Sequence, residues 1–246
     1  MQKSSILGLV SGIALATLGT ASAVQAAIIT VPTGLNPGDQ YRLVFVTSGT
    51  RDATSTNIAD YNTFVTNAVV GSALQSSLTA NGLAPTWTAI GSTSSVNAKT
   101  NTLTDPVANA STSVPIYLID GNLVATGYSD LWDGSILVPI NLTELDSQIS
   151  EEVWTGTGFD GNTRPSQFLG GSSGTAELGF SSDIDNNWIS EDDETRSLLK
   201  NLYGMSSVLT VPGGAQPQPV PEPSSLLGYI TLGSLMLGVA IRRAKK

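Results

Sequence analysis

The stretch that decides the fold reads YRLVFVT and covers Tyr41–Thr47. It is rich in β-branched and aromatic residues, and it directly follows the turn signal NPGD at 36–39. These features predict a strand that begins after a tight turn. We therefore expect residues 41–47 to form a strand.

A helix is predicted next along the chain. Apolar residues recur at helical spacing and mark one face of an amphipathic helix; they are Ile58, Tyr61, Phe64, Val65, Ala68 and Val69. Ser55 or Thr56 can cap the start of this helix, and Gly71 can end it.

Beyond the helix the sequence is typical of short strands separated by polar loops. Asp120-Gly121 predicts a tight turn between the apolar runs 116–119 and 123–125. Residues 156–179 are expected to form a long Gly/Ser-rich loop. The expected strands cover residues 87–90, 115–119 and 153–155.

The composition excludes several classes of protein. The 246 residues include no cysteine and no histidine, and the formal charge is -9. Catalytic triads with histidine, thiol catalysis, disulfides, thiolate zinc sites and iron–sulfur clusters are therefore excluded. The acidic excess argues against nucleic acid as a partner, since that binding needs a basic surface. We expect no cofactor and no conventional cytoplasmic enzyme.

Residues 1–26 are predicted to be a secretory signal peptide. Lys3 precedes the apolar stretch 6–18, and small residues follow it, among them ASA at 21–23 and VQA at 24–26. A charged start, a short apolar centre and an A-x-A cleavage site define such peptides. Cleavage is expected after residue 23 or 26, and residue 26 is favoured. The alternative is a buried helix, which the Gly- and Ala-rich composition disfavours.

The C-terminal segment has three parts in order after the Pro/Gly linker 213–219: the tripeptide PEP at 221–223, an apolar run at 226–241 and the basic end RRAKK at 242–246. Sixteen helical residues would extend roughly 24 Å, which is short for a span but sufficient for a thin inner membrane. The terminal cations are expected to stay cytoplasmic, which places the preceding domain outside. The alternative is a permanent single-span anchor on a proline stalk.

Residues 220–246 resemble the PEP-CTERM sorting signal of Gram-negative bacteria. In that family the motif is read by an exosortase, a membrane-embedded cysteine transpeptidase. The resemblance implies that Pro221, Glu222 and Pro223 are recognition residues for this partner and that anchoring in the inner membrane is transient. We expect an exported protein of the cell surface or extracellular matrix.

Between the two terminal segments, residues 27–212 are expected to form one domain. With the tail up to Glu222, the exported part holds six basic and twenty acidic residues, a net charge of -14. Such a surface repels anionic lipid, nucleic acid and acidic polysaccharide unless divalent cations bridge them.

The order of short motifs over 40–211 resembles endostatin, the C-terminal domain of certain vertebrate collagens. After strand 41–47 and a helix around Ala59-Asp60, the motifs are WTAI at 87–90 with STS at 92–94, VPIY at 114–117, DG at 120–121, LWDGS at 131–135 and VWTGT at 153–157, with GN at 161–162 close behind. The resemblance implies an α+β fold of the C-type-lectin-like class.

The departures from that family limit what the resemblance implies about function. Gly204 stands in the expected closing strand 202–205 where a cysteine would sit, and the histidines that hold the family's zinc are missing. The family's arginine-rich heparin surface is replaced by an acidic one, and the Glu-Pro-Asn and Trp-Asn-Asp sugar motifs of C-type lectins are absent. Disulfides, zinc and heparin binding are therefore not expected.

One acidic segment has the spacing of a calcium loop. Asp183, Asp185 and Asn187 occupy positions 1, 3 and 5, and Glu194 occupies position 12. Trp188 stands at position 6, where an EF-hand needs glycine, so an EF-hand is rejected. A different calcium loop is one interpretation. A solvated turn, with Trp188 packed inward and residues 190–193 starting a short helix, is favoured, so no metal is expected.

Carboxylates are the acid–base groups that remain for catalysis. A glycosidase needs two of them about 5–10 Å apart across a sugar ring. The candidates are Asp120, Asp130, Asp133, Glu151, Glu152 and Asp160. They support an alternative function, a secreted hydrolase of polysaccharide.

The four tryptophans could stack against sugars, but we expect them in the core; they are Trp87, Trp132, Trp154 and Trp188. The favoured prediction is a non-catalytic, adhesive or binding module, with exopolysaccharide or another matrix component as its expected partner.

Overall fold

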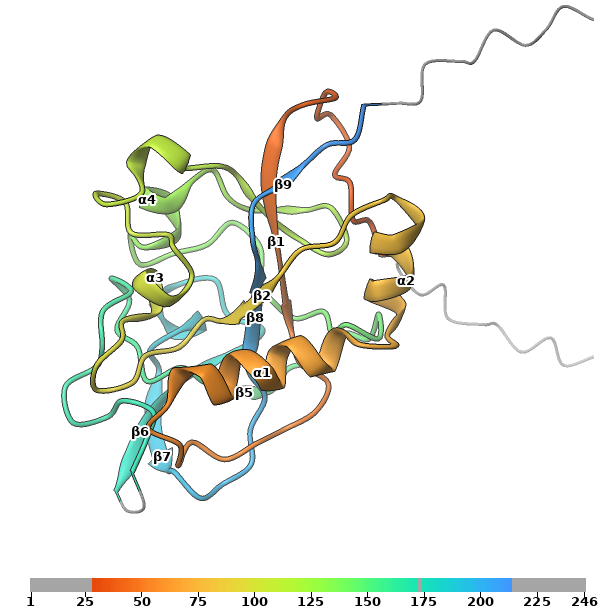
Figure 1. Cartoon of the computed structure of the whole chain (residues 1–246). Coiled ribbons are helices and arrows are strands. Elements are labelled where there is room, and N and C mark those ends of the chain that lie inside the picture. Colours follow the sequence, from red (N-terminus) through yellow and green to blue (C-terminus); the bar gives the residue numbers. More distant parts are fainter. Residues whose placement is uncertain (1–27, 172–173, 214–246) are drawn as a thin grey trace, which may run out of the picture.

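The computed structural model describes residues 28–171 and 174–213 (Figure 1). The predicted signal peptide, the PEP motif and the apolar run 226–241 lie outside these residues. Within the described ranges, no helix combines the length and apolar character that crossing a membrane requires.

Two sheets and a few short helices make up the domain. The larger sheet has the order β2-β8-β1-β3-β4, with β9 also paired to β1, and the smaller has the order β5-β6-β7. The elements are β1 (Gln40–Val46), α1 (Ile58–Val69), α2 (Ala73–Ala80), β2 (Trp87–Ala89), α3 (Ala98–Asn101), η1 (Ala110–Thr112), β3 (Ile116–Leu118), β4 (Leu123–Ala125), α4 (Tyr128–Leu131), β5 (Glu152–Trp154), β6 (Thr175–Phe180), η2 (Asn186–Trp188), β7 (Asp192–Thr195), β8 (Tyr203–Ser206) and β9 (Leu209–Thr210).

The predicted strand at 41–47 is confirmed as β1, which lies in the middle of the larger sheet. It pairs in parallel with β3 and antiparallel with β8 and β9. All of its residues after Gln40 are buried. The expected mixture of helices and strands in one domain is confirmed, as two sheets and a few helices.

The predicted helix is confirmed as α1, but its cap differs from the prediction. Asn57 is the N-cap, and its side chain accepts a hydrogen bond from the Ala59 backbone N–H at 3.1 Å. Ser55 is not the cap because its hydroxyl donates to Asp60 at 2.6 Å. Gly71, with φ +75°, follows the helix and turns the chain into α2, a helix that the sequence analysis did not predict.

The expected strands 87–90 and 115–119 are confirmed in shortened form as β2 and β3, and the expected strand 153–155 is confirmed as β5, shifted by one residue. The turn at Asp120-Gly121 joins β3 to β4, and Gly121 has φ +87°, a conformation that favours glycine there.

Two expectations for the C-terminal half are wrong. Residues 156–179 are not wholly a loop, because Thr175–Phe180 form β6. Residues 190–193 do not begin a helix, because Asp192–Thr195 form β7 and pair with β6 in the register Leu178↔Asp192. Cross-strand pairing overrides the weak strand preference of these acidic residues.

Gly204 on β8 lies in close contact with side chains of β1 and α1. A Cβ at this position would lie 2.5 Å from Cε1 of Phe45 and 2.6 Å from Cγ1 of Val65. Both neighbours are fully buried and cannot move aside. The glycine at this position is therefore a packing requirement.

We predict that Gly204→Ala lowers the free energy of unfolding by about 1–3 kcal/mol, because the added methyl overpacks the core. Gly49→Ala is the matched control, since its nearest neighbour would be Cζ of Phe64 at an ordinary 3.6 Å. Urea unfolding of both variants measures the difference. Equal stability of the two variants would contradict the close approach.

Candidate functional site

The four tryptophans are core residues, as predicted. The most exposed of them, Trp132, is only 6% accessible. Its ring stacks on Trp188 with the centroids 6.0 Å apart, and its indole N–H donates to the Thr104 hydroxyl at 3.0 Å. Trp188 also contacts Tyr203, at 5.8 Å between centroids. These rings are closed to solvent, so they offer no surface on which a sugar could stack.

The acidic segment with calcium-loop spacing is divided between two elements. Asp185 caps η2, and its Oδ1 accepts from the Asn187 backbone N–H at 3.0 Å. Glu194 lies on β7, opposite Ala176 of β6. Over residues 28–171 and 174–213, no three acidic side chains are grouped so that they could hold a metal ion. Trp188 is packed inward, as the favoured interpretation predicts.

Four of the six candidate carboxylates accept a hydrogen bond from a nearby backbone N–H. In three of them the donor lies two residues on, the local bond that makes Asp a turn residue, whereas Asp130 on α4 accepts from the residue four positions before it. The pairs are Asp120 with Asn122 at 2.9 Å, Asp130 with Thr126 at 2.6 Å, Asp133 with Ser135 at 3.1 Å and Asp160 with Asn162 at 3.1 Å.

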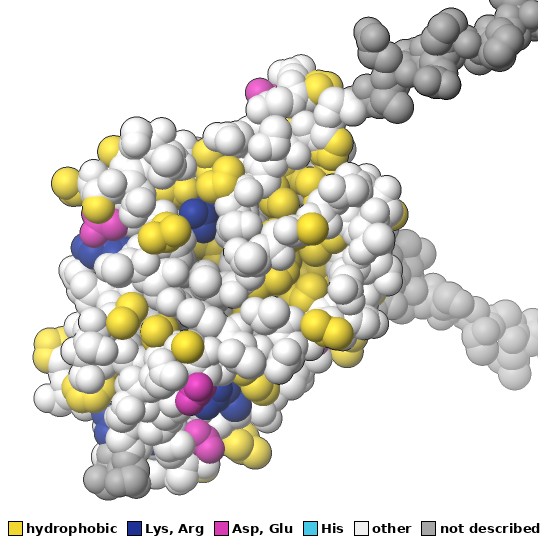
Figure 2. Space-filling view, viewed as in Figure 1, with side chains coloured by type: hydrophobic (Ala, Val, Ile, Leu, Met, Phe, Trp, Pro, Cys, Tyr) yellow, Lys and Arg dark blue, Asp and Glu magenta, His cyan; other side chains and the backbone are white. Residues whose placement is uncertain are grey.

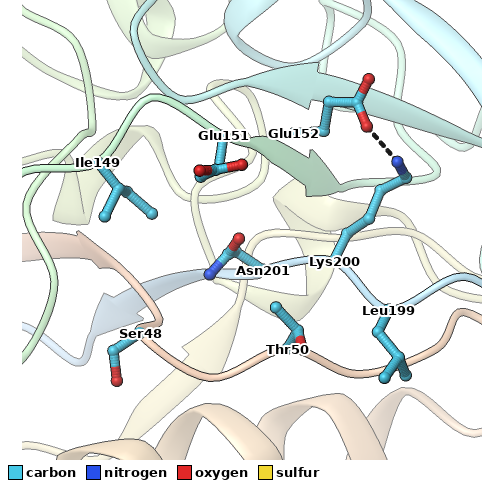
Figure 3. Close-up of a pocket in the computed structure, with 8 residues that line it drawn as sticks. All are labelled: Ser48, Thr50, Ile149, Glu151, Glu152, Leu199, Lys200 and Asn201. Atoms are coloured by element: carbon cyan, nitrogen blue, oxygen red, sulfur yellow. Dashed lines mark hydrogen bonds and ion pairs between the residues drawn. The ribbon is translucent and has the colours of Figure 1, made fainter.

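The other two candidates, Glu151 and Glu152, line an open hollow of about 330 Å³ (Figure 3). Figure 3 shows Lys200 extending to Glu152, with which it forms an ion pair. The Lys200 ammonium also lies 5.4 Å from the centre of the Trp154 ring, so it is held from two sides. Of the six candidates, only Glu151 makes no side-chain hydrogen bond or ion pair with the described residues.

Ser48 lines the same hollow, but its hydroxyl is already used. In Figure 3 it points away from Glu152 and Lys200. It donates to Glu144, which also accepts from the Ser48 backbone N–H at 2.9 Å. Glu144 is buried, so this pair closes the end of β1 against the loop that follows β4 and α4. The sequence analysis did not identify either residue.

A second buried carboxylate, besides Glu144, is Glu177 on β6. It is 3% exposed, and burial raises its pKa above 4.5. The Ser190 hydroxyl, which donates to it, and Arg164, whose Nε lies 3.4 Å away, oppose that rise. The sequence analysis missed Glu177 because it placed this residue in a loop. Its enclosure leaves no room for a substrate.

Comparison with known proteins assigns no family. No family model matches the chain, and no curated protein matches it. The functional argument therefore rests on the geometry of this chain. In that geometry the candidate side chains other than Glu151 are engaged in core packing, in local backbone hydrogen bonds or in one ion pair.

We predict that Trp132→Ala and Trp154→Ala each cost about 3–5 kcal/mol of unfolding free energy, because both rings are buried. Phe159→Ala is the control: this ring is 49% exposed, and its loss should cost no more than about 0.5 kcal/mol. Urea unfolding distinguishes them. Tryptophan variants as stable as the Phe159 variant would show that the rings do not carry the core.

We also predict a pH dependence that Glu177 controls. Because its folded pKa lies above 4.5, the folded state binds this proton more tightly than the unfolded chain. The resulting stability is complete below pH 4.5 and is lost as the pH rises through the folded pKa. The parent should therefore lose free energy relative to Glu177→Gln over that range.

Ser190→Ala is the matched variant for this test, because it removes the hydroxyl that lowers the Glu177 pKa. It should extend the loss of stability to higher pH. Urea unfolding at a series of pH values measures all three proteins. A parent-minus-Gln difference that stays constant with pH would contradict the assignment.

Proposed function

We propose that the chain is an exported protein of the cell surface or extracellular matrix, in which a non-catalytic binding module is followed by a sorting tail. The tail, 220–246, would be recognised by an exosortase at Pro221, Glu222 and Pro223. The order of motif, apolar run and basic end carries this proposal.

The placement of the last strand supports a tail that is separate from the domain. β9 pairs with the start of β1, and the Val211 backbone N–H donates to the Asp39 carbonyl at 2.8 Å. These bonds complete the sheet just before the Pro/Gly linker at 213–219. The proposed sorting motif therefore follows a domain whose sheet is already complete.

We propose further that the module has an endostatin-like, C-type-lectin-like fold. The residues that suggested the likeness are mainly core residues, among them Trp87 on β2, Ile116 on β3, Leu131 on α4 and Trp154 on β5. A likeness in buried residues supports a shared fold and carries no activity with it.

The hydrolase alternative is not proposed. Five of its six candidate carboxylates are held by nearby backbone N–H groups or by Lys200, which leaves Glu151 alone, and a glycosidase needs two that are free to act on one sugar. Turnover of a polysaccharide by the full chain that is lost in Glu151→Gln would reverse this choice.

We predict that replacing Pro221, Glu222 and Pro223 by alanine leaves export intact and blocks removal of the tail. The matched control replaces Pro217 and Pro219, which lie in the linker, and should be processed like the parent. Intact mass spectrometry of the protein from cells that contain an exosortase measures the tail.

Loss of the tail in the triple variant would contradict the sorting assignment. A parent that keeps its tail in the same cells would support the permanent anchor instead.

A further inference from the structure

A pocket of about 310 Å³ lies over the larger sheet, between β2, the end of α3 and η1. Arg42, Thr86, Thr88, Asn109 and Ser207 are among its lining residues. Figure 2 views this side of the molecule, on which charged side chains are few among polar and apolar ones. The pocket shares none of its lining residues with the hollow in Figure 3.

The strand registers place the polar lining on one face of the sheet. Thr88 of β2 lies opposite Met205 of β8, and Met205 lies opposite Val44 of β1. Residues two positions away along each strand share that face, which brings Arg42, Thr86 and Ser207 to the same side. Three chain segments far apart in the sequence thus supply the floor of the pocket.

Arg42 is a buried cation whose hydrogen bonding is incomplete. It is only 4% exposed. Its Nε donates to the Tyr128 hydroxyl at 2.9 Å, and its Nη1 donates to the carbonyls of Thr102 and Ser206 at 2.8 and 3.0 Å. Its remaining nitrogen, Nη2, has no hydrogen-bond partner among the described residues. Nη2 is not sealed from solvent, so water or a ligand in the pocket can reach it.

The guanidinium of Arg42 lies 5.3 Å from the centre of the Tyr128 ring, but its charge is not paired with any described carboxylate. None of the ion pairs among the described residues includes it. Nη2 therefore presents two N–H donors and a positive charge at the pocket. An anion that accepts from Nη2 would supply both the missing hydrogen bond and the missing charge.

The other lining residues indicate which kind of molecule bears the anionic group. The hydroxyls of Thr86 and Thr88 and the amide of Asn109 make no hydrogen bond with the described residues, so they are available to ligand hydroxyls. Leu103 and Val208 add apolar surface on which the C–H face of a sugar ring can lie.

The charge of the domain favours a single negative charge over a dianion. Residues 28–213 hold six basic and nineteen acidic residues, which repel charge-dense ligands. The repulsion between the exposed acidic residues and a ligand is screened beyond about 8 Å at physiological ionic strength. The attraction between Arg42 and a bound anion acts at contact distance and is screened less. The two N–H donors of Nη2 therefore suit one singly charged carboxylate.

We infer that the Arg42 pocket binds a hexuronic acid unit, with its carboxylate on Nη2 and its hydroxyls on the threonines and Asn109. This rests on the proposed function only in taking the domain as a binding module. It is independent of the sorting tail.

The test is calorimetric titration of the purified full chain with D-glucuronate. Saturable binding is expected. The methyl ester of glucuronate, which keeps the hydroxyls and lacks the charge, should bind about tenfold more weakly or worse, because it loses a charge-assisted hydrogen bond. Glucose 6-phosphate, a dianion with similar hydroxyls, should also bind more weakly.

Arg42→Gln should weaken glucuronate binding about as much as esterification does. Arg51→Gln is the matched control, because it removes the same charge from an arginine that lies 4.1 Å from the centre of the Tyr61 ring, away from the pocket. It should keep parent affinity.

Since Arg42 also ties three segments together, a second variant keeps the test decisive if Arg42→Gln does not fold. Asn109→Trp leaves the hydrogen bonds of Arg42 in place and fills the pocket, so it should abolish binding at parent stability in urea. Parent-like binding by Asn109→Trp would overturn the inference. Failure of glucuronate to bind the parent, equal binding of the ester or tighter binding of the phosphate would do so as well.

The two proposals fail separately. Tail removal without glucuronate binding would overturn this inference alone, and glucuronate binding without tail removal would overturn the sorting assignment alone.

Discussion

The backbone hydrogen bonds on both sides of β1 are the interactions on which the rest of the structure depends. They join β3 on one side and β8 and β9 on the other, so the beginning, middle and end of the domain meet at one strand. Because both faces of β1 are covered, Phe45 packs against Trp87 on one face, while Arg42 is enclosed on the other. The same strand therefore fixes the core and holds the buried cation.

Parts of this fold follow from local sequence. β1 and α1 show clear strand and helix patterns, and Asp120-Gly121 marks its turn because the glycine takes a positive φ. β6 and β7 could not be predicted in the same way. Asp192–Thr195 has little strand preference and becomes a strand only because Thr175–Leu178 pairs with it. The N-cap of α1 was missed because Ser55 has a better partner in Asp60.

The candidate site, like the fold, could be predicted only in part from local sequence. Residue types identified the candidate carboxylates. Three of them accept from the N–H two residues on, so an Asx-turn pattern could have marked Asp120, Asp133 and Asp160 as turn residues. Arg42 carried a signal of its own, a cation inside an apolar strand. Its role was hidden because its partners Thr102, Tyr128 and Ser206 lie 60, 86 and 164 residues away in the sequence.

The central claim is that the domain binds its ligand at Arg42 rather than at the carboxylates beside Lys200. Titration of the ¹⁵N-labelled full chain with D-glucuronate, followed by NMR, locates the contact. The account predicts that the Arg42 Nε–H and the amides of Thr88 and Ser207 shift together, while those of Glu152 and Lys200 stay in place. Shifts centred on Glu152 and Lys200, or no shifts at all, would contradict it.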